Sequence, residues 1–85
     1  MSSLNAMMVI LAVEDEVNRA ISLYPQMNSA HEGYAVLLEE VEELWDEIKK
    51  SPKRRDYAAM REEAIQVAAM AIRLIVDCVD SEITV

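Results

Sequence analysis

Residues that make turns, sheets and disulfides are scarce in this chain. Glycine and cysteine each occur once, proline occurs twice, and phenylalanine is absent. So few turn-forming and aromatic residues leave little signature of β structure, and Ala, Leu, Met and Glu, which favour helices, dominate the rest. A single cysteine, Cys78, cannot close an internal disulfide or complete a thiolate metal site. We therefore expect an all-α protein in a reduced, cytoplasmic setting.

Long apolar runs and a surplus of basic charge are also missing. The apolar run at 7–13 is short and has no basic lead-in, so it does not predict a secretory signal. Residues 64–79 are interrupted by Gln66, Arg73 and Asp77 and fall short of the ~20 residues of a membrane span. The net charge of −8 disfavours binding to a polyanion. We expect neither a membrane nor a nucleic-acid partner.

The size of the chain conflicts with its hydrophobic content. At 85 residues it is at most one domain, 1–85, yet 53% of its residues are hydrophobic. A domain this small buries only ~60% of its unfolded surface, so one copy cannot hide all of its apolar side chains. Self-association resolves the conflict, and we expect a homo-oligomer, either a dimer or a tetramer.

Three helices are predicted, at about 4–23, 30–50 and 56–79. Pro25 ends the first. Ser29 followed by Glu32 is a capping-box pattern for the second, and Asp56 or Ser51 is the N-cap of the third. Residues 81–85 are expected to be a frayed tail. The predicted fold is all-α, with a three-helix unit that forms an oligomeric helical bundle.

Apolar positions recur at helical spacing in the first two predicted helices, which indicates one buried face on each. In the first helix these positions are Ile10, Val13, Val17, Ala20, Ile21 and Tyr24. In the second they are Tyr34, Leu37, Leu38, Val41, Leu44, Trp45 and Ile48. Tyr34 and Trp45 are therefore expected to pack in the core, although either ring is also able to stack on a nucleobase.

Carboxylates form a second line on the middle helix. Glu40, Glu43 and Glu47 lie three or four residues apart, which makes them neighbours on one helix face. If the next helix runs antiparallel, Glu63 and Gln66 come to face them. Oxygen ligands from two adjacent helices suit Mg²⁺, which offsets the repulsion between the carboxylates. A solvated acidic face with no metal is the alternative.

Two short motifs resemble those of the MazG-type nucleotide pyrophosphohydrolases. Glu39-Glu40-Val41-Glu42-Glu43 fits that family's EExxE pattern, and Glu63-Ala64-Ile65-Gln66 stands where its ExxD motif follows on the next helix. The resemblance covers about 50 residues, from Ala30 to Cys78. It implies an all-α NTP-pyrophosphatase-like fold and hydrolysis of a nucleoside triphosphate to monophosphate and pyrophosphate with Mg²⁺, or alternatively Mn²⁺.

The resemblance also implies residue roles. The metal ligands would be Glu40, Glu43, Glu63 and Gln66. Glu39 would be a general base or would support a metal ligand, and Lys53, Arg54 or Arg55 would hold phosphate oxygens. Apart from the resemblance, His31 in the first turn of the second helix is able to bind a base edge or to act in acid–base chemistry, with a surface or capping role as the alternative. Gln66 replaces the family's aspartate and removes one negative charge, which weakens the expected metal site. Two alternatives stay open: a non-catalytic helical oligomer that binds a nucleotide, a metal or a protein partner, and a purely structural oligomer.

Overall fold

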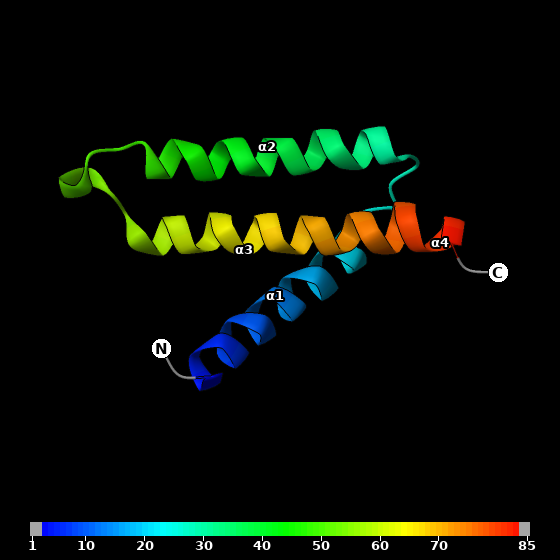
Figure 1. Cartoon of the computed structure of the whole chain (residues 1–85), viewed down its shortest axis with the longest axis horizontal. Helices are drawn as coiled ribbons and strands as arrows, with labels where there is room; N and C mark the ends of the chain where they lie inside the picture. The colour runs from blue at the N-terminus through cyan, green and yellow to red at the C-terminus, as the bar shows by residue number, and fades with distance from the viewer. Residues whose placement is uncertain (1–2, 84–85) are drawn as a thin grey trace.

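Three long helices build the molecule, and two of them form an antiparallel hairpin (Figure 1). The computed structural model describes residues 3–83, which contain helices and no strand. α1 is Ser3–Leu23, α2 is Ala30–Ile48 and α3 is Tyr57–Leu74. Beyond α3 the chain continues through a π-helical segment, η2 (Ile75–Val79), into α4 (Asp80–Ile83). The predicted all-α class is confirmed.

The arrangement of these helices is open. α2 and α3 lie side by side along their lengths, whereas α1 crosses α3 obliquely and its backbone does not approach α2 (Figure 1). The chain measures 49 × 29 × 22 Å, and its radius of gyration is 14.5 Å. A compact domain of this length would have a radius of gyration of about 12 Å. Much of the first half of α1 therefore extends away from the hairpin.

Polar side chains define where the helices begin. The Ser29 hydroxyl accepts a hydrogen bond from the Glu32 N–H at 3.1 Å, as the capping box predicts. The Glu32 carboxylate accepts from the Asn28 N–H instead of from Ser29. Asp56 caps α3 through the Ala59 N–H. Ser51 instead precedes a short 3₁₀ turn, η1 (Pro52–Arg54), and makes no capping bond.

The core is small and lies where α1 crosses α3. Val13 of α1 packs with Ile65 and Ala69 of α3, and Ala69 is only 2% exposed. Partly buried residues surround them: Ala12, Val17 and Ala68. Met70 of α3 is buried as well. Only the middle of α1 is covered, because two helices that cross obliquely touch over a few turns.

Several predicted core residues are exposed instead. Tyr34 and Trp45 are open to solvent, so the expectation that they pack inside one copy is wrong. The apolar stripe of α2 is wider than its contact with α3, and both aromatic residues lie on the uncovered part. Ile10, Ile21 and Tyr24 of α1 are exposed because α3 covers only the middle of that helix.

The end of the chain is more ordered than predicted. Residues 81–83 are helical rather than frayed, and residues 84–85 lie outside the described range. The Asp77 carboxylate accepts a hydrogen bond from the Met27 N–H at 3.1 Å, and Gln26 donates to the Asp77 carbonyl at 3.4 Å. These bonds fasten η2 to the segment between α1 and α2, which extends the helix past its predicted end. None of the helices in residues 3–83 combines the length and apolarity that a membrane span requires.

Candidate metal centre and adjoining cleft

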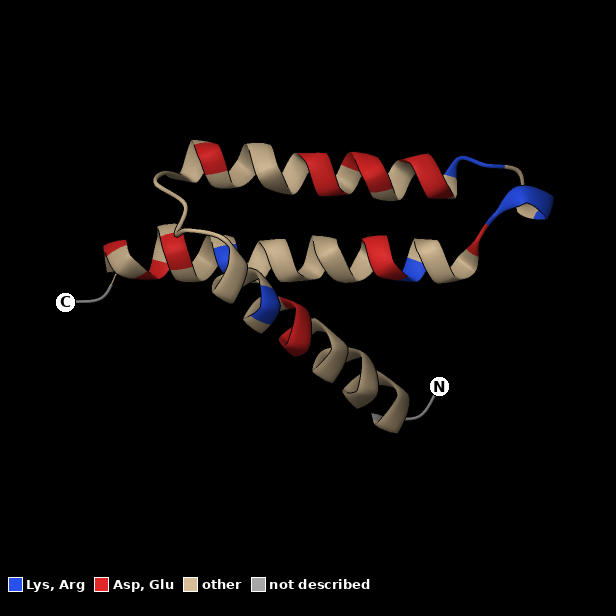
Figure 2. Cartoon of the chain, turned by 180° about the vertical axis from the view of Figure 1, so that it is seen from behind, with Lys and Arg blue, Asp and Glu red and all other residues tan. Residues whose placement is uncertain are grey.

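Three of the predicted metal ligands meet between α2 and α3. Glu40, Glu43 and Glu63 each offer a carboxylate oxygen, and these three atoms lie within 4.8 Å of one another. Glu40 and Glu43 are one turn apart on α2, and the antiparallel hairpin brings Glu63 of α3 opposite them. We call these residues the carboxylate trio. Figure 2 shows the acidic segments on the two helices of the hairpin.

The electrostatics of the trio are unfavourable without a positive partner. Burial, followed by the nearby charge of Glu43, raises the pKa of Glu40 to about 7. Burial and the hydrogen bond shared with Glu43 raise the pKa of Glu63 as well. None of the ion pairs in residues 3–83 involves a member of the trio. Like charges held this close favour proton or cation uptake.

One oxygen of the trio lacks a hydrogen-bond partner. The Glu63 Oε2 atom is buried and has no hydrogen-bond partner. A buried polar atom left in this state costs free energy unless a ligand satisfies it. Three hard oxygen donors, one of them orphaned, are a suitable partial shell for Mg²⁺ or Mn²⁺, which complete their coordination with water or phosphate oxygens. The residues present therefore fit the cation that the sequence motif implies.

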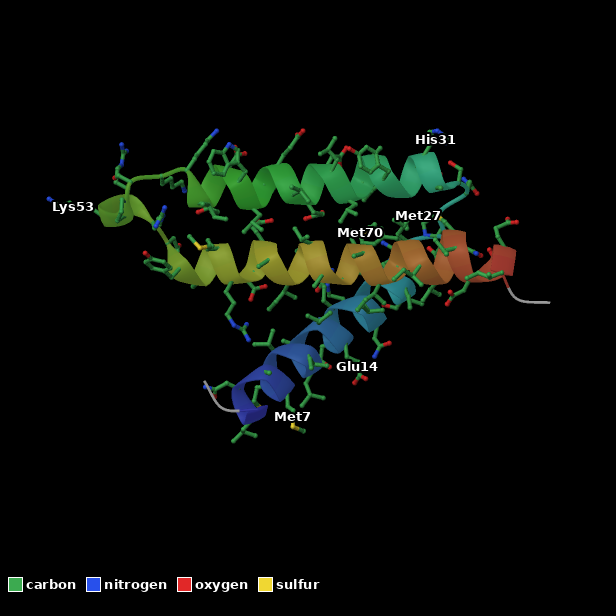
Figure 3. All side chains as sticks on the ribbon, viewed as in Figure 1. Met7, Glu14, Met27, His31, Lys53 and Met70 are labelled. Carbon is green, nitrogen blue, oxygen red and sulfur yellow. The ribbon has the colours of Figure 1, made fainter. Side chains whose placement is uncertain are left out.

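A cleft adjoins the trio on the side nearer the start of α2. Its volume is about 350 Å³, and Glu40 and Gln66 both line it. Apolar side chains from all three helices form much of its wall: Ala20, Val36, Ala69 and Met70. Met27 and Met70 are labelled where the linker meets α3 (Figure 3). A ligand in this cleft would lie beside the trio.

Gln66 faces this cleft and also α1. The pKa of Glu16 on α1 is lowered chiefly by its hydrogen bond to Arg19 and in smaller part by one to Gln66, against the opposing effect of burial. Arg19 Nη2 lies 2.6 Å from the Glu16 carboxylate. The Gln66 side chain thus has Glu16 of α1 as a polar neighbour while it lines the cleft.

Sequence reasoning missed the part of the cleft wall that α1 and the end of α3 supply. Glu16 and Arg19 line the cleft, but nothing in the sequence indicates how α1 crosses α3. Arg73 lines it too and is only 7% exposed. Arg73 donates to the Pro25 carbonyl at 3.4 Å, and its Nε atom has no partner. A charged residue in the otherwise apolar stretch 67–76 was the available signal for this position.

The predicted phosphate-binding residues lie at the other end of the hairpin. Lys53, Arg54 and Arg55 belong to the loop between α2 and α3, where the basic residues gather (Figure 2). Arg55 donates from Nε and Nη2 to the Ile48 carbonyl at 3.1 and 2.8 Å, which closes the end of α2. None of the three lines the cleft. Their contact with a nucleotide stays a prediction.

His31 and Glu39 have different relations to the site. His31 is exposed at the start of α2, and Figure 3 places it at the opposite end of the hairpin from Lys53. The helix between them spans about 25 Å at 1.5 Å per residue, so the two residues lie far apart within one copy. Glu39 is exposed, and its charge adds to the raised pKa of its neighbour Glu40. Glu39 therefore lies close enough to influence the trio.

Comparison with known proteins adds no identification. No family model, curated protein or solved structure matches this chain. The resemblance to the MazG-type enzymes rests on the two motifs alone, and the functional argument rests on the trio and the cleft.

Proposed function

We propose that this chain is a divalent-cation-dependent nucleotide pyrophosphohydrolase of the MazG-like kind. The observation that carries the proposal is the carboxylate trio, with its orphaned Glu63 oxygen, beside a partly apolar cleft that Glu40 lines. A nucleoside triphosphate has the matching chemistry, because its phosphates share a cation with carboxylates and its base suits an apolar wall. Hydrolysis of the bond between the α- and β-phosphates would yield a monophosphate and pyrophosphate.

Each residue of the site has its own role in the proposed hydrolysis. Glu40, Glu43 and Glu63 would hold Mg²⁺, and the bound cation would supply neutralisation of phosphate charge and a lower pKa for a water molecule. Glu39, next to the trio and open to solvent, takes the proton of the attacking water as general base. Val36, Ala69 and Met70 exclude water from the cleft around the rest of the nucleotide. The Gln66 amide oxygen is a neutral and therefore weaker ligand than an aspartate.

A second candidate function follows from Gln66. Because its side chain is also close enough to Glu16 of α1 to lower the pKa of that carboxyl, it need not complete the metal shell. With one charge fewer, the site would hold the cation more loosely and polarise water less. The chain would then be a non-catalytic relative that binds a nucleotide or a metal without turnover, or presents the same helices to a protein partner.

A matched pair of variants tests these functions. Glu63→Gln changes the trio, whereas Glu62→Gln changes an exposed neighbour on the same helix. Pyrophosphate release from a panel of nucleoside triphosphates with Mg²⁺ or Mn²⁺ should fall at least about 100-fold in Glu63→Gln, equivalent to ~2.7 kcal/mol of transition-state stabilisation. Turnover in Glu62→Gln should match that of the unaltered chain.

The outcomes separate the candidates. No turnover across the panel rejects the enzyme. If Mg²⁺ and nucleotide then still raise the melting temperature, and Glu63→Gln abolishes this effect, the binding function stands. A chain that is folded, inactive and indifferent to both ligands has only a solvated acidic face.

We also propose that the protein works as a homo-oligomer, with a cytoplasmic location that suits its single free thiol, Cys78. The support is the first half of α1, where large apolar side chains are exposed around the helix: Leu4, Met7, Met8, Val9, Ile10 and Leu11. A helix that is apolar on all sides is normally buried on all sides. Figure 3 shows Met7 at the end of α1 that points away from the hairpin.

A further inference from the structure

A second unpartnered apolar surface runs along α2, on the side of the helix away from the carboxylate trio. It consists of Tyr34, Leu38, Val41 and Trp45, which are 61, 38, 41 and 58% exposed. We call it the α2 seam. Its spacing alternates between four and three residues, the pattern with which one helix packs along another. None of the four residues lines the cleft.

The α2 seam is arranged symmetrically along the helix. Tyr34 and Trp45 lie equally far on either side of the midpoint between Glu39 and Glu40, and so do Leu38 and Val41. A two-fold axis through this point, perpendicular to α2, maps the seam onto itself. Such an axis places Tyr34 against the partner's Trp45 and Leu38 against the partner's Val41. Self-complementarity of this kind is what an isologous dimer contact requires.

From this symmetry we propose that two copies of the chain pair through their α2 seams, with the two helices antiparallel. This inference extends the proposed self-association, and it is independent of hydrolysis because the trio lies on the other side of α2. The occupant of the seam is a second copy rather than an unrelated helix, because the seam is complementary to itself in both spacing and residue size.

Charge placement agrees with the antiparallel direction. The exposed residues along one flank of the seam are His31, Ala35, Glu42 and Lys49. The same two-fold axis sets Glu42 near the partner's Ala35 and Lys49 near the partner's His31, so no carboxylate on this flank faces another. A parallel pair would instead align the two helix dipoles, which repel side by side.

The four seam residues supply about half of the area that a specific interface takes. A fully buried aromatic side chain contributes about 150–250 Å², so the exposed parts of the four seam residues offer about 400 Å² per copy. A standard interface takes ~800 Å² from each partner. The exposed residues on the flank add to the area of the seam.

Sedimentation velocity of the full chain, compared with two variants, tests the surface. Leu38→Glu places a carboxylate in the middle of the seam, whereas Leu23→Glu alters a more exposed leucine on α1, whose backbone does not approach α2. The dimer dissociation constant should rise at least tenfold in Leu38→Glu and stay within about twofold in Leu23→Glu. Circular dichroism should show unchanged helix content in both.

Cross-linking in a Cys78→Ala background tests the direction. His31→Cys and Lys49→Cys chains, mixed and treated with a short bis-maleimide, should cross-link to each other. His31→Cys alone should not cross-link, because its two thiols would lie about 25 Å apart along the helix. Cross-linking of His31→Cys to itself overturns the antiparallel pairing.

A Leu38→Glu variant that stays dimeric overturns the seam but leaves self-association intact. A chain that is monomeric at all concentrations overturns both, and a hydrolytic activity measured on that monomer would be unaffected.

Discussion

At the scale of single residues, the raised pKa of Glu40 is the main electrostatic feature of the candidate site. Its pKa of about 7 means that the folded chain binds this proton more tightly than the unfolded chain, whose carboxyl has the ordinary value of 4.5. An ionised Glu40 therefore destabilises the fold at pH 8 without a cation. Glu40→Gln should remove that penalty. Because Glu40 is only partly buried, solvent screening limits the gain to about 1 kcal/mol, or ~4–8 °C in Tm.

Thermal melts at pH 8 in a chelator measure this effect. Glu42→Gln, an exposed neighbour on the same helix, is the control and should leave Tm within about 2 °C of the unaltered chain. The same Glu40→Gln variant should lose any rise in Tm on addition of Mg²⁺. A Glu40→Gln chain less stable than the unaltered one at pH 8 would mean that the carboxylate supports the fold, against the interpretation of a strained metal site.

At the scale of helices, the first turn of α2 depends on one hydroxyl. Ser29→Ala removes the bond that the Ser29 Oγ atom accepts from the Glu32 N–H, and should cost about 1 kcal/mol of stability, within a range of ~0.5–2 kcal/mol. Ser51→Ala is the matched control, because Ser51 precedes η1 without making a capping bond. Urea unfolding of both variants measures the difference, and equal losses would contradict the capping role.

The helices and their contacts were predictable from the sequence only in part. Three- and four-residue spacings predicted the long helices and the meeting of Glu40 and Glu43 with Glu63, because an antiparallel hairpin leaves little choice of facing residues. The environment of Tyr34 and Trp45 was not predictable, since one wide apolar stripe does not reveal that it serves two faces. Nor were Glu16 and Arg19, because their place in the cleft depends on the crossing of α1 over α3, which no local pattern encodes.

At the scale of the whole molecule, protons and divalent cations compete for one site. Below pH 7, a cation must displace the proton of Glu40, and the raised pKa of Glu63 adds to the competition. For a group of pKa about 7, this competition weakens apparent affinity roughly tenfold at pH 6 relative to pH 8. Mg²⁺ should therefore bind more weakly, and stabilise the fold less, at the lower pH.

Without cations, the stability of the fold decreases as the pH rises, whereas the affinity for Mg²⁺ increases. A raised carboxyl pKa contributes stability that is present while the group is protonated and is lost as pH rises from 4.5 through 7. Tm in chelator should therefore fall over that window, while the increment from Mg²⁺ grows. At ten times its dissociation constant, the cation adds about 1.4 kcal/mol, or ~5–10 °C.

Calorimetric titration with Mg²⁺ at pH 6, 7 and 8, in two buffers of different ionisation enthalpy, tests this competition directly. The difference between buffers counts the protons released, which should approach one or more per cation at pH 6 and decline toward pH 8. Glu62→Gln should preserve that profile and Glu63→Gln should lose it. Binding of equal strength at all three pH values, with no proton released, would place the cation away from the carboxylate trio, even if the chain bound it tightly.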